Sequence, residues 1–345
     1  MTHLKYLDIL LLCAGNRLNA RLFGIRNLGV VMNWVIRVLI LCSDGVVIHG
    51  ILTNGGVTWF SVAKAFCNLP EPIVLMMYAT RRSRIIGLLK KIQSSDSPSI
   101  RKSSMKWLLF TSIFIAFQVA CTARMYNART PFQLIIWMLS VFPYQMNQSL
   151  IIYPVYYMVT LKVLTEKELD HLTNICKLVG RGSRDVNRML DDVSNMRSIK
   201  EEFERLFNLV PFFAFGIMFV SIPSYLLSIS HDLNSGKTNI FQQLISFGIF
   251  HIAVCIVVLF LVHCVSHVKE TVNKSISDLI RDIQRRYIRD LHNTGYQSLI
   301  DELRMDQGFV FTGCNMFVID RFILLSFLSS IISFSVLLIQ LGNSA

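Results

Sequence analysis

The sequence predicts an all-α fold, a bundle of seven transmembrane helices with a cytoplasmic N-terminus and long cytoplasmic helical extensions. The chain of 345 residues is 53% hydrophobic and only 16% charged, whereas a soluble domain carries about 25% charged residues. Seven apolar segments are each long enough to cross a bilayer, which takes about 20 residues. The basic residues fall almost entirely in alternate gaps between these segments.

The predicted spans are separated by gaps that alternate in character. The gaps after spans one, three and five are short, whereas those after spans two, four and six are long and basic. Span four is longer than a bilayer requires, so we expect its end to continue as a helix into the cytoplasm. The predicted spans are 28–52, 57–79, 107–126, 132–163, 206–229, 241–263 and 322–341.

These spans divide the chain into six predicted regions. They are a cytoplasmic N-terminal segment (1–27), spans one to four (28–163), cytoplasmic amphipathic helices (164–205), spans five and six (206–263), a cytoplasmic amphipathic helix with the entry to the last span (264–320), and span seven with an extracellular C-terminus (321–345).

The distribution of Lys and Arg predicts the orientation. The N-terminus, the three long loops and Arg321 together hold 29 of these residues, while the opposite side holds Arg124, Arg129 and Lys237. Because Lys and Arg concentrate on the cytoplasmic side, we expect a multi-pass plasma-membrane protein with its N-terminus inside, the reverse of a G-protein-coupled receptor. The net charge of +12 then faces the anionic inner leaflet of the lipid bilayer rather than nucleic acid.

Four ionisable residues lie at membrane depth in the first two spans. They are Arg37 and Asp44 in span one, and Lys64 and Glu71 in span two. The short turn between these spans makes them antiparallel, and facing residues in such a hairpin have a constant sum of residue numbers. Arg37 should therefore lie level with Glu71, and Asp44 with Lys64. Since an unpaired charge in the bilayer is costly, we expect two ion pairs; the alternative is that one of these residues lines a ligand cavity.

The segments 164–205 and 265–304 are too polar to cross a membrane but have apolar residues at helical spacing. In the second segment the stripe includes Val268, Val272, Ile276, Leu279 and Ile283. Two interpretations remain open. The helices lie on the inner leaflet, or they form a packed cytoplasmic bundle that could hold subunits together.

The last span carries a stripe of small polar residues on one helical face. A Gln facing hydrocarbon would be costly, so this face meets either water or other helices. Serine stripes commonly form packing seams between membrane helices, and a pore lining is the alternative. The stripe consists of Ser326, Ser330, Ser333, Gln340 and Ser344, with Leu337 filling the gap.

Two C-terminal stretches resemble the signature of insect gustatory receptors. They are residues 313–321 (GCNMFVIDR) and 333–341 (SFSVLLIQL). In that family the last span ends in Thr-Tyr, five hydrophobic residues and Gln-Phe. Here Ser, Phe and Leu replace Thr, Tyr and the final Phe, while the Gln and the spacing are kept. The family shares with insect odorant receptors a superfamily of seven-transmembrane ligand-gated ion channels.

The resemblance implies a homo- or heterotetrameric cation channel whose last spans line a central pore. In that family the cytoplasmic helices form most of the contact between subunits. Carried over to this chain, Gln340 and Leu341 would sit at or next to the gate, with Ser333 and Leu337 on the pore wall below. Hydroxyls and an amide hydrate a cation without binding it tightly, and a ring of Leu closes a pore by dewetting. We therefore expect poor selectivity among monovalent cations, with calcium permeation left open.

The resemblance also implies a pocket for a small-molecule tastant in the outer half of spans one to six. Pockets of this kind are mostly apolar and aromatic with a few polar groups. Hydrogen bonding between neighbouring helices is the other interpretation of the candidates, and nothing distinguishes a sugar from a bitter compound. The candidate residues are Gln118, Gln133, Trp137, Tyr144, Asn147, Ser221, Tyr225, Gln243 and His251.

The sequence has no signature of an enzyme or of a metal or cofactor site, since GxSxG, HExxH, a Walker loop and metal-spaced Cys/His clusters are absent from it. Two other membrane classes remain as alternatives. One is an odorant-receptor-type subunit that needs a coreceptor. The other is a transporter, for which inverted repeats and helices broken near the midplane would be expected.

Overall fold

The structure is a computed structural model that describes six stretches of the chain. These are 70–92, 149–180, 185–234, 240–287, 294–307 and 309–344, together with residues 34–35, 37–38, 49, 106, 109 and 113. Nearly all of these residues are helical, as the sequence predicts. The elements are α4 (Pro70–Thr80), α5 (Arg82–Ile92), α9 (Ser149–Gly180), α10 (Val186–Phe207), α11 (Leu209–Asn234), α12 (Ile240–Arg286), α13 (Thr294–Gln307), β1 (Thr312–Gly313), β2 (Phe317–Val318) and α14 (Arg321–Ser344).

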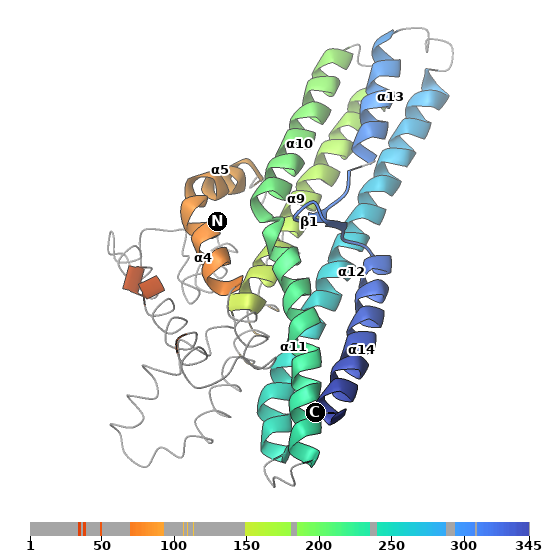
Figure 1. The fold of residues 1–345 in the computed structure, drawn as a ribbon. Coiled ribbons are helices and arrows are strands. Elements are labelled where there is room, and N and C mark those ends of the chain that lie inside the picture. Colours follow the sequence, from red (N-terminus) through yellow and green to blue (C-terminus); the bar gives the residue numbers. More distant parts are fainter. Residues whose placement is uncertain are drawn as a thin grey trace.

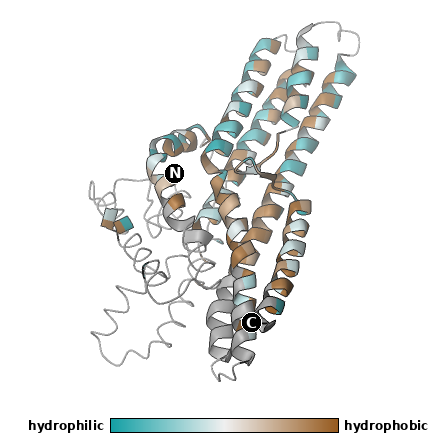
Figure 2. Cartoon of the chain, viewed as in Figure 1, coloured by the Kyte–Doolittle hydropathy of each residue, from teal (hydrophilic) through white to brown (hydrophobic). Residues whose placement is uncertain are grey.

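Two long helices, α9 and α12, pack against each other and connect the two ends of the molecule (Figure 1). At one end α10 and α13 complete a four-helix bundle, and at the other end α11 and α14 pack beside α12. Hydrophilic residues are frequent in the first bundle, whereas the described parts of α11, α14 and the adjoining half of α12 are mostly hydrophobic (Figure 2). The assignment of the first bundle to the cytoplasm stays a prediction.

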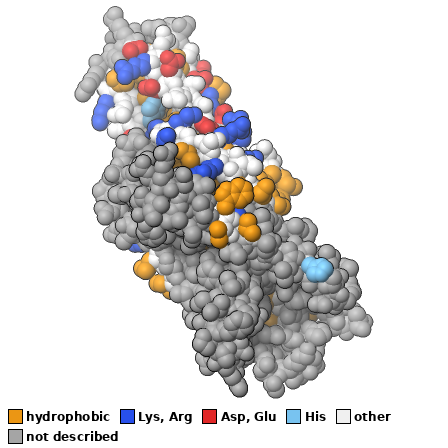
Figure 3. Space-filling model, turned by 90° about the vertical axis from the view of Figure 1, so that its left-hand side faces the viewer, with side chains coloured by type: hydrophobic (Ala, Val, Ile, Leu, Met, Phe, Trp, Pro, Cys, Tyr) orange, Lys and Arg blue, Asp and Glu red, His pale blue; other side chains and the backbone are white. Residues whose placement is uncertain are grey.

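The charged residues that the structure describes lie mainly toward one end of the face drawn in Figure 3. In a view turned by 90°, the Lys, Arg, Asp and Glu side chains of the described residues gather over one half of the molecule, and hydrophobic side chains follow below them (Figure 3). Among the described residues, Ile252–Arg286 is long and apolar enough to cross a membrane, and the bent pair α10–α11 brings the count to two. Residues Arg321–Leu337 form a shorter apolar helix.

The four-helix bundle has a continuous apolar core. The predicted stripe of α12 is buried, with Ile276 and Ile283 fully inaccessible to solvent. Leu299 and Leu303 of α13 and the buried series of α10 that includes Met189 and Val193 belong to the same core. The observed arrangement is therefore a packed helical bundle rather than separate amphipathic helices.

The chain bends by 40° between α10 and the first part of α11. Pro211 lies in the first turn of α11 and has no N–H to donate to the carbonyl of Phe207, so the helix cannot continue unbroken. Asn208 caps α10 by donating its backbone N–H to the carbonyl of Glu204 at 2.9 Å. The sequence placed the start of this span at Leu206, so the observed start at Leu209 moves that boundary by less than one helical turn.

An aromatic cluster lies where the bend meets α4 and α9. Tyr78 stacks on Tyr153 with ring centroids 4.7 Å apart, and Phe203 lies 4.9 Å from Phe207. Tyr157 contacts both phenylalanines at 5.2 and 6.4 Å. These rings are fully buried and hold the lower part of α9 against the end of α10.

Candidate functional site

The last helix, α14, begins directly after a short antiparallel hairpin. Strand β1 pairs with β2 so that Thr312 lies opposite Val318. The carboxylate of Asp320 accepts the backbone N–H of Ile323 at 2.7 Å and so caps the helix. Arg321 forms a solvent-exposed ion pair with Glu270 of α12, at 3.0 Å. The start of α14 is therefore fixed by hydrogen bonds as well as by packing.

One face of α14 packs on the membrane part of the bundle. Ile331 and Ser335 are buried, and the Ser335 hydroxyl donates to the carbonyl of Ile331 at 2.6 Å. Phe327 lies 4.9 Å from the ring of Phe215 in α11. This face is wholly occupied by its neighbours within the subunit.

The rest of the helix surface is exposed and divides into two adjacent faces, given 3.6 residues per turn. On the first, which we call the polar face, every described side chain of the predicted stripe is exposed, with Leu337 half accessible to solvent. The second, the apolar face, exposes large hydrophobic side chains. The polar face consists of Ser326, Ser330, Ser333, Leu337 and Gln340, and the apolar face of Phe322, Leu325, Ile332 and Val336, with the exposed Ser329 among them.

The signature positions of the last helix have different surroundings. Ser333 and Gln340 lie on the polar face. The aromatic position, Phe334, turns toward the bundle and stacks on Phe219 with ring centroids 5.7 Å apart. Leu341 belongs to α14, but its side chain lies outside the described residues. The assignment of Gln340 and Leu341 to a gate therefore stays a prediction.

The predicted ligand-pocket residues are only partly described. Tyr225 is half-buried on α11. Ser221 of α11, and Gln243 and His251 of α12, belong to described helices, but their side chains do not belong to the described residues. Outside the described part of the chain lie Gln118, Gln133, Trp137, Tyr144 and Asn147. The pocket among these residues stays a prediction.

The two predicted ion pairs of the first hairpin also stay predictions. The Arg37 guanidinium lies 5.6 Å from the ring centroid of Trp34, one helical turn before it. Glu71 belongs to α4 without a described side chain, and Asp44 and Lys64 lie outside the described residues.

A buried charge cluster in the cytoplasmic bundle was missed by the sequence analysis. The ammonium of Lys200 in α10 lies 2.8 Å from a carboxylate oxygen of Glu168 in α9 and 2.6 Å from one of Asp306 in α13. All three residues are almost inaccessible to solvent. Burial raises the pKa of Glu168 to about 7, although Lys200 opposes this shift. The signal in the sequence was Lys200 itself, which lies beside Ile199 and Phe203 on the apolar stripe of α10.

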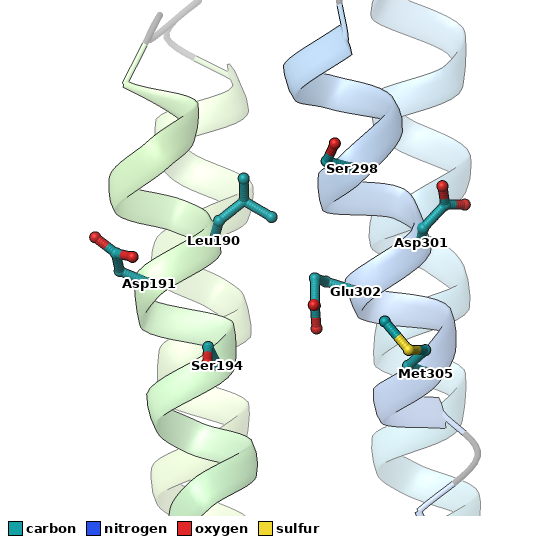
Figure 4. A pocket seen from close by; sticks show the side chains of 7 residues that line it. All are labelled: Leu190, Asp191, Ser194, Ser298, Asp301, Glu302 and Met305. Atoms are coloured by element: carbon teal, nitrogen blue, oxygen red, sulfur yellow. The ribbon is translucent and has the colours of Figure 1, made fainter.

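An open groove of about 420 Å³ lies beside this cluster, between α10 and α13 (Figure 4). Leu190 extends from α10 toward α13, and Glu302 lies on the side of α13 next to the gap, where its carboxylate is 2.7 Å from the guanidinium of Arg197. The lining is acidic and partly apolar. It consists of Leu190, Asp191, Ser194, Ser298, Asp301, Glu302 and Met305. Within the described ranges, no group of three or more His, Cys, Asp or Glu side chains is placed to hold a metal ion.

Comparisons with known proteins agree with this architecture. The insect olfactory receptor OR5 from Machilis hrabei has a similar fold, with a TM-score of 0.70 at 10% sequence identity, covering 98% of this chain and 97% of the receptor. The structure of the same receptor in complex with eugenol gives a TM-score of 0.68 at the same identity and coverage. A search of curated protein sequences gives no match.

The sequence profile of the 7tm chemosensory receptor family matches residues 73–342. This match covers most of the chain, including the cytoplasmic bundle, the hairpin and the greater part of α14. It also agrees with the resemblance carried by the C-terminal signature. The protein is therefore a multi-pass membrane protein that belongs to the 7tm chemosensory receptor family.

Proposed function

We propose that this chemosensory receptor is a gustatory receptor that acts as a ligand-gated, poorly selective cation channel, with α14 lining the pore of a tetramer. The observation that carries the proposal is the arrangement of faces on α14. In a lone helix in lipid the polar side chains of Ser330, Ser333 and Gln340 would lie against hydrocarbon, and the transfer of hydroxyl and amide groups from water to hydrocarbon is unfavourable. A central pore gives the polar face water, and the apolar face beside it then meets lipid or a neighbouring subunit.

The chemistry of the polar face suits a weakly selective pore. Its described members are neutral, and the Ser330 hydroxyl already donates to the carbonyl of Ser326 at 2.9 Å. The oxygen of that hydroxyl still presents lone pairs outward, which can replace part of a cation's hydration shell without trapping it. Leu337 on the same face can close the path by dewetting when four copies approach.

The ligand is proposed to be a small molecule held among the spans. Support comes from the relative of similar fold whose structure was determined in complex with eugenol. The candidate pocket residues of α11 and α12, Ser221, Tyr225 and His251, are on the helices that pack against α14 or connect to the cytoplasmic bundle. A ligand among them would act directly on the helices that support the pore.

Cysteine accessibility along α14 tests the pore. Cysteines are introduced singly at Ser330, Ser333 and Gln340 of the polar face, and at Leu325 and Ile332 of the apolar face as matched controls. A small cationic thiol reagent applied during ligand-evoked current should block the polar-face variants and spare the controls, once the response of the unchanged protein has been subtracted. Block at both faces alike, or at the apolar face only, would refute the assignment.

Expression of this chain alone in a non-native cell separates the remaining classes. A cation current evoked by a tastant supports the gustatory type. A silent protein that conducts only with a coreceptor indicates the odorant type, and substrate-coupled flux indicates a transporter. An epitope tag after residue 345 should be accessible on intact cells, and a protected tag would refute the proposed extracellular C-terminus.

A further inference from the structure

The only covalent connection between the cytoplasmic bundle and α14 is the segment 308–320, whose described part forms the β1–β2 hairpin (Figure 1). Its turn is tight. Met316 donates its backbone N–H to the carbonyl of Gly313 at 2.9 Å, and both central residues, Cys314 and Asn315, have positive φ angles of 55° and 58°. A hairpin of this kind has little internal freedom, so a displacement at one end is passed to the other.

The hairpin is attached to the α10–α11 bend by directed hydrogen bonds. One carboxylate oxygen of Glu204 accepts the backbone N–H of Thr312 at 2.7 Å and also the Thr312 hydroxyl. The carbonyl of Asn208, left free where α10 ends, accepts the backbone N–H of Cys314 at 3.0 Å. Because an anionic acceptor makes stronger hydrogen bonds than a neutral one, Glu204 is the stronger of the two attachments.

Aromatic packing supports the same position. Phe311 is buried and lies 6.1 Å from the ring of Phe203 in α10, and Phe317 lies 5.2 Å from Phe215 in α11. The ring of Phe317 occupies the space where a side chain on Gly313 would be. Aromatic contacts thus hold the hairpin against α10, which precedes the bend, and against α11, which follows it.

The contacts of α14 beyond the hairpin are different in kind. Within the described residues, the contacts of its buried face with α11 are apolar and aromatic, such as the stacking of Phe334 on Phe219. Apolar contacts are not directional, so one helix can slide or rotate on another with little loss. The directed hydrogen bonds to the half-buried carboxylate of Glu204 oppose such movement.

We propose that the β1–β2 hairpin is a fixed fulcrum, in which Glu204 and Asn208 hold the base of the last helix on the α10–α11 bend while α14 moves during gating. This inference rests on the proposed function, because it assumes that α14 lines the pore. Glu204 is a positioning residue: it acts on the pore only through the hairpin. A ligand-driven movement of α11 then changes the tilt of α14 about a base that stays in place.

A crosslink between the bend and the hairpin tests the fulcrum. A backbone hydrogen bond of 3.0 Å between positions 208 and 314 keeps two Cα atoms about 5–6 Å apart, within the range of a disulfide. The variant Asn208→Cys supplies the partner for the native Cys314, and Asn208→Cys with Cys314→Ser is the matched control. An oxidant is applied to the cytoplasmic side of excised patches, and the crosslink is verified by mass spectrometry.

The expected result is a ligand-evoked current that persists when the crosslink has formed. Loss of the current on oxidation, restored by a reductant and absent in the control, would show that the hairpin must move and would overturn the fulcrum. Failure of the crosslink to form would also count against it, because the two backbones would not be held together. A channel that never conducts, crosslinked or not, would instead refute the proposed pore.

A second set of variants tests Glu204 without a crosslink. Glu204→Leu removes the acceptor, and we expect the ligand concentration for half-maximal current to rise roughly tenfold, the effect of losing a hydrogen bond to a charged group. Glu204→Gln keeps an acceptor and should restore most of the sensitivity. Glu201→Leu, at an exposed position of the same helix, is the control. Equal surface amounts with an unchanged response of Glu204→Leu would overturn the role of Glu204.

Discussion

The buried carboxyl of Glu168 makes the stability of the cytoplasmic bundle dependent on pH. Lys200 lies between Glu168 and Asp306, so one cation serves two buried carboxylates. Replacing Glu168 by Gln keeps a side chain of the same size that can accept a hydrogen bond from Lys200, and it removes the titratable group. The variant should therefore fold as the original protein does but lose one component of its pH dependence.

The sign and size of the effect follow from the two pKa values. Burial raises the pKa of Glu168 from 4.5 to about 7 in the folded protein. The folded state therefore binds this proton more tightly than the unfolded state does. The stabilisation is complete below pH 4.5 and is lost as the pH rises through 7. The difference between the two pKa values corresponds to a change of at most about 3 kcal/mol in the free energy of unfolding.

Thermal unfolding of the purified protein in lipid nanodiscs, at about pH 5 and about pH 8, measures this component. The midpoint of the original protein should fall more between the two pH values than that of Glu168→Gln, by several degrees at a fixed scan rate. Titrating groups outside this cluster contribute equally to both proteins and cancel in the comparison. Glu201→Gln, at an exposed position, should behave as the original. The same fall for all three proteins would refute the reasoning.

Three further predictions concern single positions. Lys200→Met leaves two buried carboxylates without a cation, so we expect a loss of about 3–5 kcal/mol in stability; thermal unfolding measures it, and a midpoint equal to that of the exposed Lys274→Met control would contradict it. Gly313→Ala places a Cβ atom against the aromatic ring of the next strand. It should cost about 1–3 kcal/mol and lower surface expression, whereas Gly87→Ala, with open space around its Cβ, should not. Asp320→Ala removes the acceptor that caps α14 and should cost about 1 kcal/mol, while the unfolding midpoint of Asp320→Asn should stay close to the original.

The helical character of the described segments could be predicted from the sequence because its signals are local. The stripe through Val272, Ile276 and Leu279 repeats every three or four residues, and the structure buries it in the bundle. The polar face of α14 could be named for the same reason. Periodicity along one helix indicates which residues share a face. It does not indicate whether that face contacts water or other helices.

The hairpin before α14 could not be predicted in the same way. Its strands are two residues long, too short for an alternating pattern of polar and apolar residues. The predicted start of span five, Leu206, differs from the observed start of α11, Leu209, for a related reason. Leu206 and Phe207 are as apolar as the span that follows, so hydropathy does not mark the break that precedes Pro211.

The sequence by itself determined the all-α membrane architecture, the family and the residues that share a face of the last helix, because hydropathy, helical period and a short motif are properties of neighbouring residues. Only the tertiary structure decided which distant residues meet. Glu168, Lys200 and Asp306 come from three separate helices, and Glu204 and Asn208, which hold Thr312 and Cys314 on the bend, lie far from them in the sequence. Their contacts depend on how the helices pack, and packing is set by the shape of the whole core rather than by any one segment.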